Sequence, residues 1–373
     1  SCTEQIQFGN SFLEKAPGGD VPADTVFNSA EYTQQFLTGI YTLQYYGLPY
    51  RSGDGNSHSY WSGQIEAMSD CWHVSSNAVA GIYNNIYNGY LQASKGNPVY
   101  GFTEEDNWKL VRRAWMLIEN ADKVPGLDES TKARYQAEAK CLIASAYFNM
   151  MRFYGGLPLV THSYQVNGDL HDTSRASVEK TVNFIVQLFD EAINSKAMPW
   201  AYSADEISTM TAHWTTAAAM AMKCKVLQYA ASPLSNDSQP YYQGKYTMES
   251  VAQDSMVWYG GYHKELWQQC KKACEDFLNR NEAEGEPYHL VMPTAKTQEA
   301  YRYAFRHAYL DQSSPEVIFS TRVTNSNHSS SYSWPARQYM RTNDRYAYNP
   351  TEEYIEMFPW ADGTPFDWKS DSI

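Results

Sequence analysis

The stretch AEAKCLIASAYFNMMRFYGGLPLV, residues 137–160, is the most informative segment of this 373-residue sequence. Its Ala and Ser residues favour a helix whose backbone can approach its neighbours closely. Gly155, Gly156 and Pro158 then end the helical pattern, because glycine suits a helix end and proline cannot continue a helix. A phosphate-binding glycine loop would instead open a helix and follow the pattern G-x-x-x-x-G-K-[ST]. The stretch therefore predicts a tightly packed helix that turns sharply, and no catalytic loop.

The same pattern occurs a second time in the chain. AYFNMMRFYGGLPL (146–159) aligns without gaps with AMKCKVLQYAASPL (221–234), so that Tyr154 matches Tyr229 and Pro158 matches Pro233. The spacing is a little over two tetratricopeptide periods of ~34 residues. This repeat predicts a mostly α fold, in which tetratricopeptide-like helical hairpins form an α-solenoid scaffold.

Apolar residues at helical spacing predict further helices along the chain. A capping box at Asn28–Glu31 would start the first one, with Phe36, Leu37, Ile40 and Tyr41 on its apolar face and Gly47 at its end. The other expected helices cover 75–92, 106–122, 177–194, 215–231 and about 263–280.

The character of the sequence changes after about residue 232. PYHLVM (287–292) and EVIFSTRV (316–323) predict short strands or extended segments, and 324–348 predicts a long loop. Long loops on a rigid scaffold commonly carry binding residues. We expect a tether over 1–25, a tetratricopeptide-like helical scaffold over 26–232, and an irregular, loop-rich C-terminal subdomain over 233–373.

Composition and charge argue against nucleic-acid binding and against a membrane-spanning helix. A net charge of −13 disfavours nucleic-acid binding, which needs clustered Lys and Arg. The 30 Tyr and 11 Trp residues are unusual, and these side chains combine a flat apolar face with a polar tip. No apolar run reaches the ~18–20 residues of a membrane-spanning helix.

The six cysteines, at positions 2, 71, 141, 224, 270 and 274, are not spaced as a disulfide framework. Cys270 and Cys274 share a helix face, where parallel Cβ directions disfavour a bridge. Cys141 and Cys224 lie in apolar helices and are expected to be buried free thiols. A zinc site is not indicated, because further ligands at suitable spacing are lacking. Ser1-Cys2 is typical of a lipoprotein processing site, although an arbitrary start of the sequence would also explain it.

Two common catalytic motifs are absent from the sequence. The sequence contains neither H-E-x-x-H nor G-x-S-x-G. Its adjacent acidic residues, such as Glu104-Glu105 and Glu352-Glu353, are more typical of solvated helix starts than of a glycosidase pair facing each other across a sugar.

From Asn28 almost to its end, the sequence resembles the SusD/RagB family of outer-membrane lipoproteins of Bacteroidetes. The resemblance comes in blocks that follow the family's order. Residues 137–160 are similar to the most recognisable segment of the family, and Asn120 stands in the Asn place of the block before it. Asn149 and Gly156 depart from the family pattern, where an acidic residue is commoner, and Ile143 replaces the usual Arg. The remaining blocks cover 27–44, 108–124, 175–199, 214–234 and 349–367.

The resemblance implies lipidation of Cys2 and attachment to the outer membrane at the cell surface. It also implies capture of an oligosaccharide or polysaccharide and its transfer to a SusC-like TonB-dependent transporter, without catalysis. Some relatives capture peptides or other nutrients instead. Because the family usually continues well beyond the block at Asp362-Gly363, we expect the C-terminal subdomain to be incomplete here.

Sugars offer CH faces that stack on Trp and Tyr, and hydroxyl groups that need polar partners. Two stretches outside the helical stripes combine both kinds of side chain, with Trp72 and Trp334 as the leading candidates. In 60–77 the candidate ligand-binding residues are Trp61, Asp70, Trp72, His73 and Asn77. In 322–345 they are Arg322, Asn325, Tyr332, Trp334, Arg341 and Asn343.

Two alternatives remain at this point. A helical glycoside hydrolase would share the acidic, aromatic-rich composition, and a tetratricopeptide adaptor would bind a protein tail in its helical groove. No cofactor is expected. Ca²⁺ stays open, although the sequence contains no twelve-residue EF-hand loop.

Overall fold

The structure, a computed structural model, describes residues 23–44, 69–74, 105–164, 174–241, 255–311, 313–320 and 348–371. Most of these residues are helical, which confirms the predicted fold class. The predicted helix over 75–92 lies outside the described residues.

The chain divides into two compact units, which are described one at a time. The larger unit contains Ser1–Gln44 and Asn107–Arg322, and the smaller contains Tyr45–Asp106 and Val323–Ile373. Each unit is thus assembled from two separate stretches of the sequence. The predicted boundary at residue 232 does not coincide with this division, because the helix that follows it packs on the scaffold.

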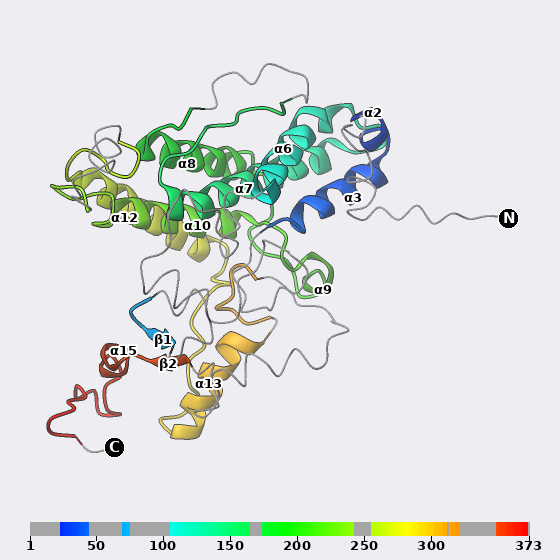
Figure 1. Cartoon of the computed structure of the whole chain (residues 1–373). Coiled ribbons are helices and arrows are strands. Elements are labelled where there is room, and N and C mark those ends of the chain that lie inside the picture. The colour runs from blue at the N-terminus through cyan, green and yellow to red at the C-terminus, as the bar shows by residue number, and fades with distance from the viewer. Residues whose placement is uncertain are drawn as a thin grey trace. The chain divides into compact units, whose positions relative to one another are not determined.

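Helices make up most of the described part of the larger unit (Figure 1). In chain order they are α2 (Ala23–Val26), α3 (Ala30–Tyr41), α6 (Glu105–Asn120), the 3₁₀ helix η3 (Ala121–Lys123), α7 (Glu129–Tyr154), α8 (Val178–Asn194), α9 (Ile207–Met210), α10 (Thr216–Ala231), α12 (Lys264–Ala283) and α13 (Gln298–Leu310).

Successive long helices pack side by side, as expected of a helical-repeat scaffold. α7 packs against α8, α8 against α10, and α10 against α12 (Figure 1). The predicted apolar positions of α6 are all buried: Leu110, Ala114 and Leu117, together with Ala121 of η3. α7 is buried along most of its length, since its small residues let neighbours approach on more than one side.

The turn after α7 has a geometry that requires two glycines. Gly155 has a φ of 71°, which favours glycine, and its amide donates to the carbonyl of Met151. A Cβ atom added at Gly156 would clash with the carbonyl oxygen of Ala176. Arg175 donates from Nε to the Gly156 carbonyl at 2.8 Å. The glycines therefore allow a close approach of backbone segments.

Aromatic hydroxyl groups hold the two repeated turns. The Tyr147 hydroxyl donates to the Pro158 carbonyl at 2.6 Å and accepts from the Val160 amide at 2.8 Å. Tyr229, which aligns with Tyr154, donates to the Arg152 carbonyl at 2.9 Å. The second copy of the pattern is thereby attached to the end of the first.

Local details correct three predictions. The N-cap of α3 is Ser29, whose side chain accepts from the Tyr32 amide, so the capping box at Asn28–Glu31 is wrong by one residue. α3 ends at Tyr41 rather than at Gly47. The described parts of 287–292 and 316–323 contain no strand. The His289 amide donates to the carbonyl of Pro315, which directly precedes the second segment. The strand prediction is therefore wrong for the described residues of both segments, and 316–320 contains a turn and bends.

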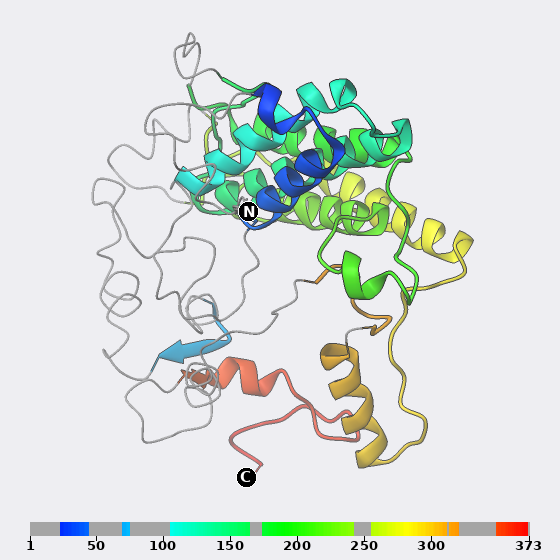
Figure 2. The ribbon, with the colours of Figure 1, turned by 90° about the vertical axis from the view of Figure 1, so that its right-hand side faces the viewer.

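The described part of the smaller unit contains a short antiparallel ladder and one helix (Figure 2). Strand β1 (Trp72–Val74) pairs with β2 (Tyr348–Pro350), so that Trp72 lies opposite Pro350. α15 (Glu352–Glu356) follows β2 at once, with Thr351 as its N-cap.

Candidate functional site

Three predicted ligand-binding residues lie at the β1–β2 ladder. Trp72 is partly buried in β1, and His73 beside it is exposed. Asp70 is exposed in the turn before β1, and its carbonyl accepts a hydrogen bond from the Thr351 hydroxyl. The Thr351 amide donates to the Cys71 carbonyl at 2.9 Å. Residue 351 thus joins the turn before β1 to the start of α15.

The β1–β2 ladder places two of the predicted ligand-binding side chains, Trp72 and His73, on different faces. Successive side chains of a strand point to opposite faces, so Trp72 and His73 face opposite sides. His73 lies opposite Asn349, and Trp72 lies opposite Pro350. One face of the ladder therefore carries the Trp72 ring and the other carries the His73 ring. A flat ligand bound to one face cannot contact both rings.

The other predicted site residues lie outside the described residues. They are Trp61, Asn77, Arg322, Asn325, Tyr332, Trp334, Arg341 and Asn343. Cys2, the predicted lipidation residue, also lies outside them.

Aromatic side chains of α15 and of the residues directly after it extend the surface on the Trp72 side. The rings of Trp72 and Tyr354 have centroids 6.1 Å apart, tilted by 46°. Tyr354 in turn meets Phe358 edge to face at 5.2 Å. Phe358 is 59% exposed. We call Trp72, Tyr354 and Phe358, with Asp70 beside them, the ladder site.

The sequence analysis missed the α15 contribution to this site. Tyr354 and Phe358 are four residues apart, which places them on one side of a helical turn. The stretch EYIEMFPW (353–360) contains this spacing, but it was interpreted only as part of the family resemblance. Trp360, 47% exposed, follows directly, and its indole donates to the Asp371 carboxylate at 3.0 Å.

A second exposed aromatic surface belongs to α13 of the larger unit, and the sequence analysis did not predict this helix. Among its residues only Ala304 is buried. Phe305 and Tyr309 are 81% and 80% exposed. Large exposed apolar areas of this kind mark interaction surfaces in soluble proteins.

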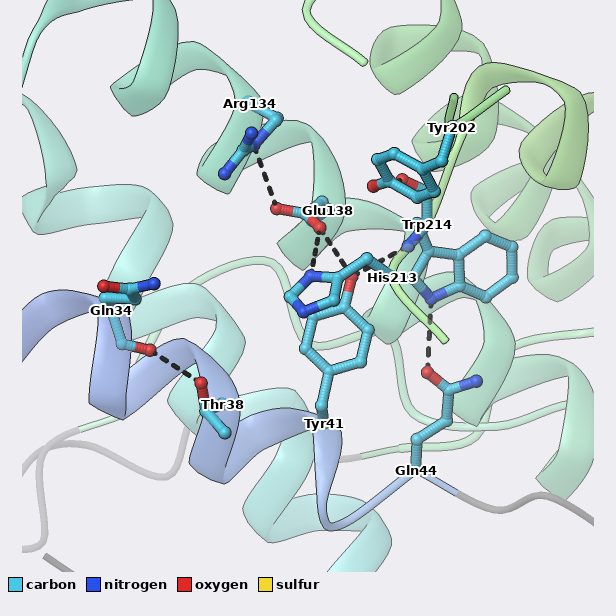
Figure 3. A network of polar contacts seen from close by, with 9 residues as sticks. All are labelled: Gln34, Thr38, Tyr41, Gln44, Arg134, Glu138, Tyr202, His213 and Trp214. Carbon is cyan, nitrogen blue, oxygen red and sulfur yellow. Dashed lines mark hydrogen bonds and ion pairs between the residues drawn. The ribbon is translucent and has the colours of Figure 1, made fainter. Parts of the chain in front are cut away.

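A buried polar network lies inside the larger unit, where α3, α7 and the segment before α10 meet (Figure 3). Glu138 of α7 is fully buried. Its Oε1 accepts from the Tyr41 hydroxyl at 2.9 Å and lies 2.8 Å from Nδ1 of His213. Arg134, one turn earlier on α7, lies 3.7 Å from Oε2 of Glu138. We call these four residues the Glu138 network.

The network also fixes Trp214, which is fully buried. The Tyr41 hydroxyl accepts from the Trp214 amide at 3.0 Å, and the indole donates to Gln44 at 3.2 Å (Figure 3). Burial raises the pKa of Tyr41 well above its usual range, and the nearby Glu138 charge raises it further. Tyr41 is therefore a neutral hydrogen-bonding group at all physiological pH values.

A small pocket opens beside this network within the larger unit. Its volume is about 180 Å³, below the roughly 300–1,000 Å³ of sites for drug-sized ligands. His213 lines it together with Tyr202, Tyr288 and Phe319. Tyr202 also donates to the Trp214 carbonyl at 3.2 Å. The His213 ring thus has the Glu138 carboxylate on one nitrogen and contributes to the pocket wall.

Metal-ion clusters and membrane-spanning helices are both absent from the described residues. Within them, no group of three or more His, Cys, Asp or Glu side chains is placed to hold a metal ion. None of the helices in the described ranges is long and apolar enough to cross a lipid bilayer.

Comparisons with known proteins identify the fold. No family description matches this sequence, and no curated protein matches it significantly. A SusD-like protein from Bacteroides fragilis NCTC 9343 superposes with a TM-score of 0.61 at 20% identity, over 92% of this chain and 55% of that protein. A SusD superfamily protein from Bacteroides vulgatus ATCC 8482 gives a TM-score of 0.55 at 16% identity, over 89% of this chain and 62% of that protein.

The fold is that of a mostly helical scaffold protein. More specifically, this chain has the fold of SusD-like proteins, so the resemblance seen in the sequence is confirmed at the level of the fold. The chain spans less than two thirds of the length of either structure.

Proposed function

We propose that this chain belongs to a cell-surface lipoprotein that captures an oligosaccharide or polysaccharide and passes it to a SusC-like TonB-dependent transporter. In this proposal the protein performs no catalysis. Cys2 carries the lipid anchor, and the captured glycan binds at the ladder site.

The arrangement of Trp72, Tyr354 and Phe358 is the observation that carries the proposal. Three aromatic rings follow one another on the smaller unit, at centroid distances of 6.1 and 5.2 Å. Aromatic rings of this kind can stack on the apolar face of a sugar unit. The exposed Asp70 carboxylate beside them supplies an acceptor for sugar hydroxyl groups. The SusD-like fold supports the same role.

The Trp334 stretch is proposed to bind the glycan as well. Arg322, Asn325, Tyr332, Arg341 and Asn343 would add hydrogen bonds there, and Trp334 would add a second stacking platform. Trp61, His73 and Asn77 would complete the first stretch, with His73 contacting a ligand branch on the opposite face of β1.

A glycan array followed by calorimetry tests the binding proposal. We expect Trp72→Ala to weaken binding of the best array glycan about tenfold or more, which corresponds to ~1.4 kcal/mol. Trp334→Ala should have a similar effect. Trp267→Ala is the matched control, since Trp267 on α12 is 40% exposed and lies on the scaffold. Unchanged affinity in both test variants, or an equal loss in the control, would contradict the assigned site.

Two further measurements test the remaining parts of the role. Cells that express a Cys2→Ser variant should release the protein from the membrane fraction, whereas wild-type protein stays bound. A pull-down from solubilised outer membranes should recover a TonB-dependent transporter with the wild type. Release of reducing ends from the bound glycan, lost on substitution of one carboxylate, would instead support a glycoside hydrolase.

A further inference from the structure

The pocket that His213, Tyr202, Tyr288 and Phe319 line has the size of a site for one small ring. We call it the His213 pocket. Its described lining residues all lie between positions 201 and 320, so this wall belongs to the larger unit. Its volume is about 180 Å³. A cavity of about 150 Å³ can hold benzene, so the His213 pocket can hold a single six-membered ring.

The wall of the His213 pocket combines an aromatic face with hydroxyl groups. Phe319 stacks on the buried Trp214 ring, with centroids 4.6 Å apart and planes at 24°. Hydroxyl groups come from Tyr202, Thr211, Ser313 and Ser320, among others. The described part of the wall contains no Asp, Glu, Lys or Arg. A neutral ligand with both an apolar face and polar groups fits this lining, because a buried charge would lack a partner of opposite sign.

The His213 ring is held so that one of its nitrogens stays available. Nδ1 lies 2.8 Å from Oε1 of Glu138, and the ring centroid lies 4.6 Å from that of Tyr41 (Figure 3). The Glu138 oxygen accepts from Nδ1, so Nε2 is the acceptor of the neutral imidazole. The His213 side chain is 25% exposed while Glu138 is fully buried. The open part of the ring therefore lies away from Glu138, on the side that bears Nε2.

The backbone before His213 is strained. Ala212, which also lines the His213 pocket, has a φ of 74°, in a region that alanine rarely adopts. The His213 amide donates to the Met210 carbonyl at 3.0 Å, and the Trp214 amide donates to the Tyr41 hydroxyl at 3.0 Å. These bonds fix the chain on the far side of Ala212. Strained residues of this kind are concentrated at ligand sites, where the surrounding contacts hold a side chain in a functional orientation.

We propose that the His213 pocket binds one neutral six-membered ring that carries hydroxyl groups, such as a pyranose or a cyclitol. The apolar face of the ring packs on Phe319, and one hydroxyl group hydrogen-bonds with Nε2 of His213. A hydroxyl group suits His213 in either protonation state, because it can donate to Nε2 or accept from Nε2–H. The His213 pocket shares no residue with the ladder site, and this proposal does not rest on glycan capture there.

Saturation-transfer NMR on the full chain tests the proposal. The probes are D-glucose, D-galactose, D-mannose and myo-inositol, each at millimolar concentration, and we expect transfer to at least one of them. Binding of hexoses alone would identify a sugar pocket, and binding of myo-inositol alone a cyclitol pocket. Ser313→Trp should weaken binding at least tenfold, because a large side chain at this exposed wall position fills the pocket. Ala204→Trp, exposed and outside the described lining, is the matched control and should bind as the wild type does.

A second pair of variants tests the assigned contact. His213→Phe keeps a ring beside Tyr41 but removes Nε2, and it should weaken binding about tenfold. Trp72→Ala, in the ladder site, should leave this binding unchanged. Circular dichroism checks that each variant is folded. If His213→Phe does not fold, Ser313→Trp still decides whether the ligand occupies the His213 pocket, because Ser313 lies outside the Glu138 network.

Several outcomes would overturn the proposal. Transfer to none of the four probes, or equal affinity in Ser313→Trp and wild type, would show that the His213 pocket does not bind such a ring. Tighter binding of D-glucuronate than of D-glucose would contradict a neutral ligand. If the array glycan binds and the single-ring probes do not, this inference fails while the proposed function stands. If the single rings bind and no array glycan does, the proposed function fails instead.

Discussion

Two helices of the larger unit, α7 and α13, use aromatic residues in opposite ways. Phe148 of α7 is 3% exposed and Phe305 of α13 is 81% exposed. α7 surrounds its aromatic rings with Ala, Ser and Cys, and most of the helix after residue 136 is buried. α13 alternates Tyr and Phe with Arg and His, and Ala304 is its single buried residue.

This difference shows that aromatic content alone does not indicate burial. Small residues on several faces of α7 let α3, α8 and α10 approach it, and its aromatic rings fill the spaces between them. α13 carries Ala300, Ala304 and Ala308 on one face, but only Ala304 is buried, and the rings of Phe305 and Tyr309 remain at the surface. We therefore expect α7 to determine stability, and the exposed rings of α13 to contribute little to it.

The largest expected contrast comes from removing a ring from each helix. Phe148→Ala should cost about 3–5 kcal/mol of unfolding free energy, because the ring meets Tyr229 edge to face at 5.8 Å in the core. Phe305→Ala should change it by less than about 0.5 kcal/mol. Chemical denaturation followed by circular dichroism measures both. An equal loss for Phe305→Ala would show that α13 is packed in solution.

The turn at the end of α7 should be nearly as sensitive. Gly156→Ala should cost about 3 kcal/mol, because the new Cβ would overlap the Ala176 carbonyl. Gly39→Ala is the matched control: Gly39 lies inside α3 with free space around it, so this change should stabilise by about 0.5–1 kcal/mol. Thermal melts of the two variants should shift in opposite directions, and a stable Gly156→Ala variant would contradict the tight turn.

Removal of the buried charge on α7 should have a slightly smaller effect. Glu138→Gln should cost about 2–3 kcal/mol, because Arg134 and His213 lose their anionic partner inside the protein. In Glu191→Gln the ion pair with Lys140 is lost at the surface, where such pairs contribute less than about 1 kcal/mol. If both substitutions cost the same, the Glu138 network does not stabilise the scaffold.

The smallest expected effect depends on pH. Tyr41→Phe removes the hydroxyl between Glu138 and Trp214 and should cost about 1–2 kcal/mol at neutral pH. Burial raises the folded-state pKa of Tyr41, so its contribution is complete below the unfolded pKa of about 10 and is lost as the pH rises above that value.

Denaturation from pH 7 to 11 measures this loss. Wild-type stability should fall above about pH 10, by up to ~1.4 kcal/mol per pH unit for each such tyrosine. The slope should be shallower in Tyr41→Phe, although burial also raises the pKa of Tyr147, Tyr202 and Tyr259. Tyr309→Phe, on exposed α13, is the control and should keep the wild-type slope. Equal slopes in Tyr41→Phe and wild type would contradict the role of Tyr41.

Much of the scaffold could be predicted because its signals are local. The helical spacing of Leu110, Ala114 and Leu117 identified α6, and the glycines after Tyr154 identified the end of α7. α13 was missed because it lies in the region after residue 232 that was expected to be irregular, although Tyr301, Phe305 and Tyr309 recur at helical spacing. The strands expected near residues 290 and 318 are not found in the described residues. A strand-forming sequence depends on packing against a partner strand, and the local sequence does not show whether one is present.

The candidate site could be predicted only in part. Composition identified the stretch that holds Asp70, Trp72 and His73, and the structure places these residues in one turn and one strand. The two faces that carry Trp72 and His73 are defined only once β1 pairs with β2. The first residue of β2 follows the first residue of β1 by 276 positions (348 − 72). Tyr354 joins Trp72 only through that pairing.

The sequence by itself determined the helical scaffold, the small-residue packing of α7 and the glycine turn that ends it. These features depend on contacts within a few residues, or on side-chain size at a helical period. The tertiary structure alone decided the Glu138 network and the aromatic contacts of the ladder site. Each of these joins side chains from distant segments, and no local pattern specifies which distant segments a fold will bring together.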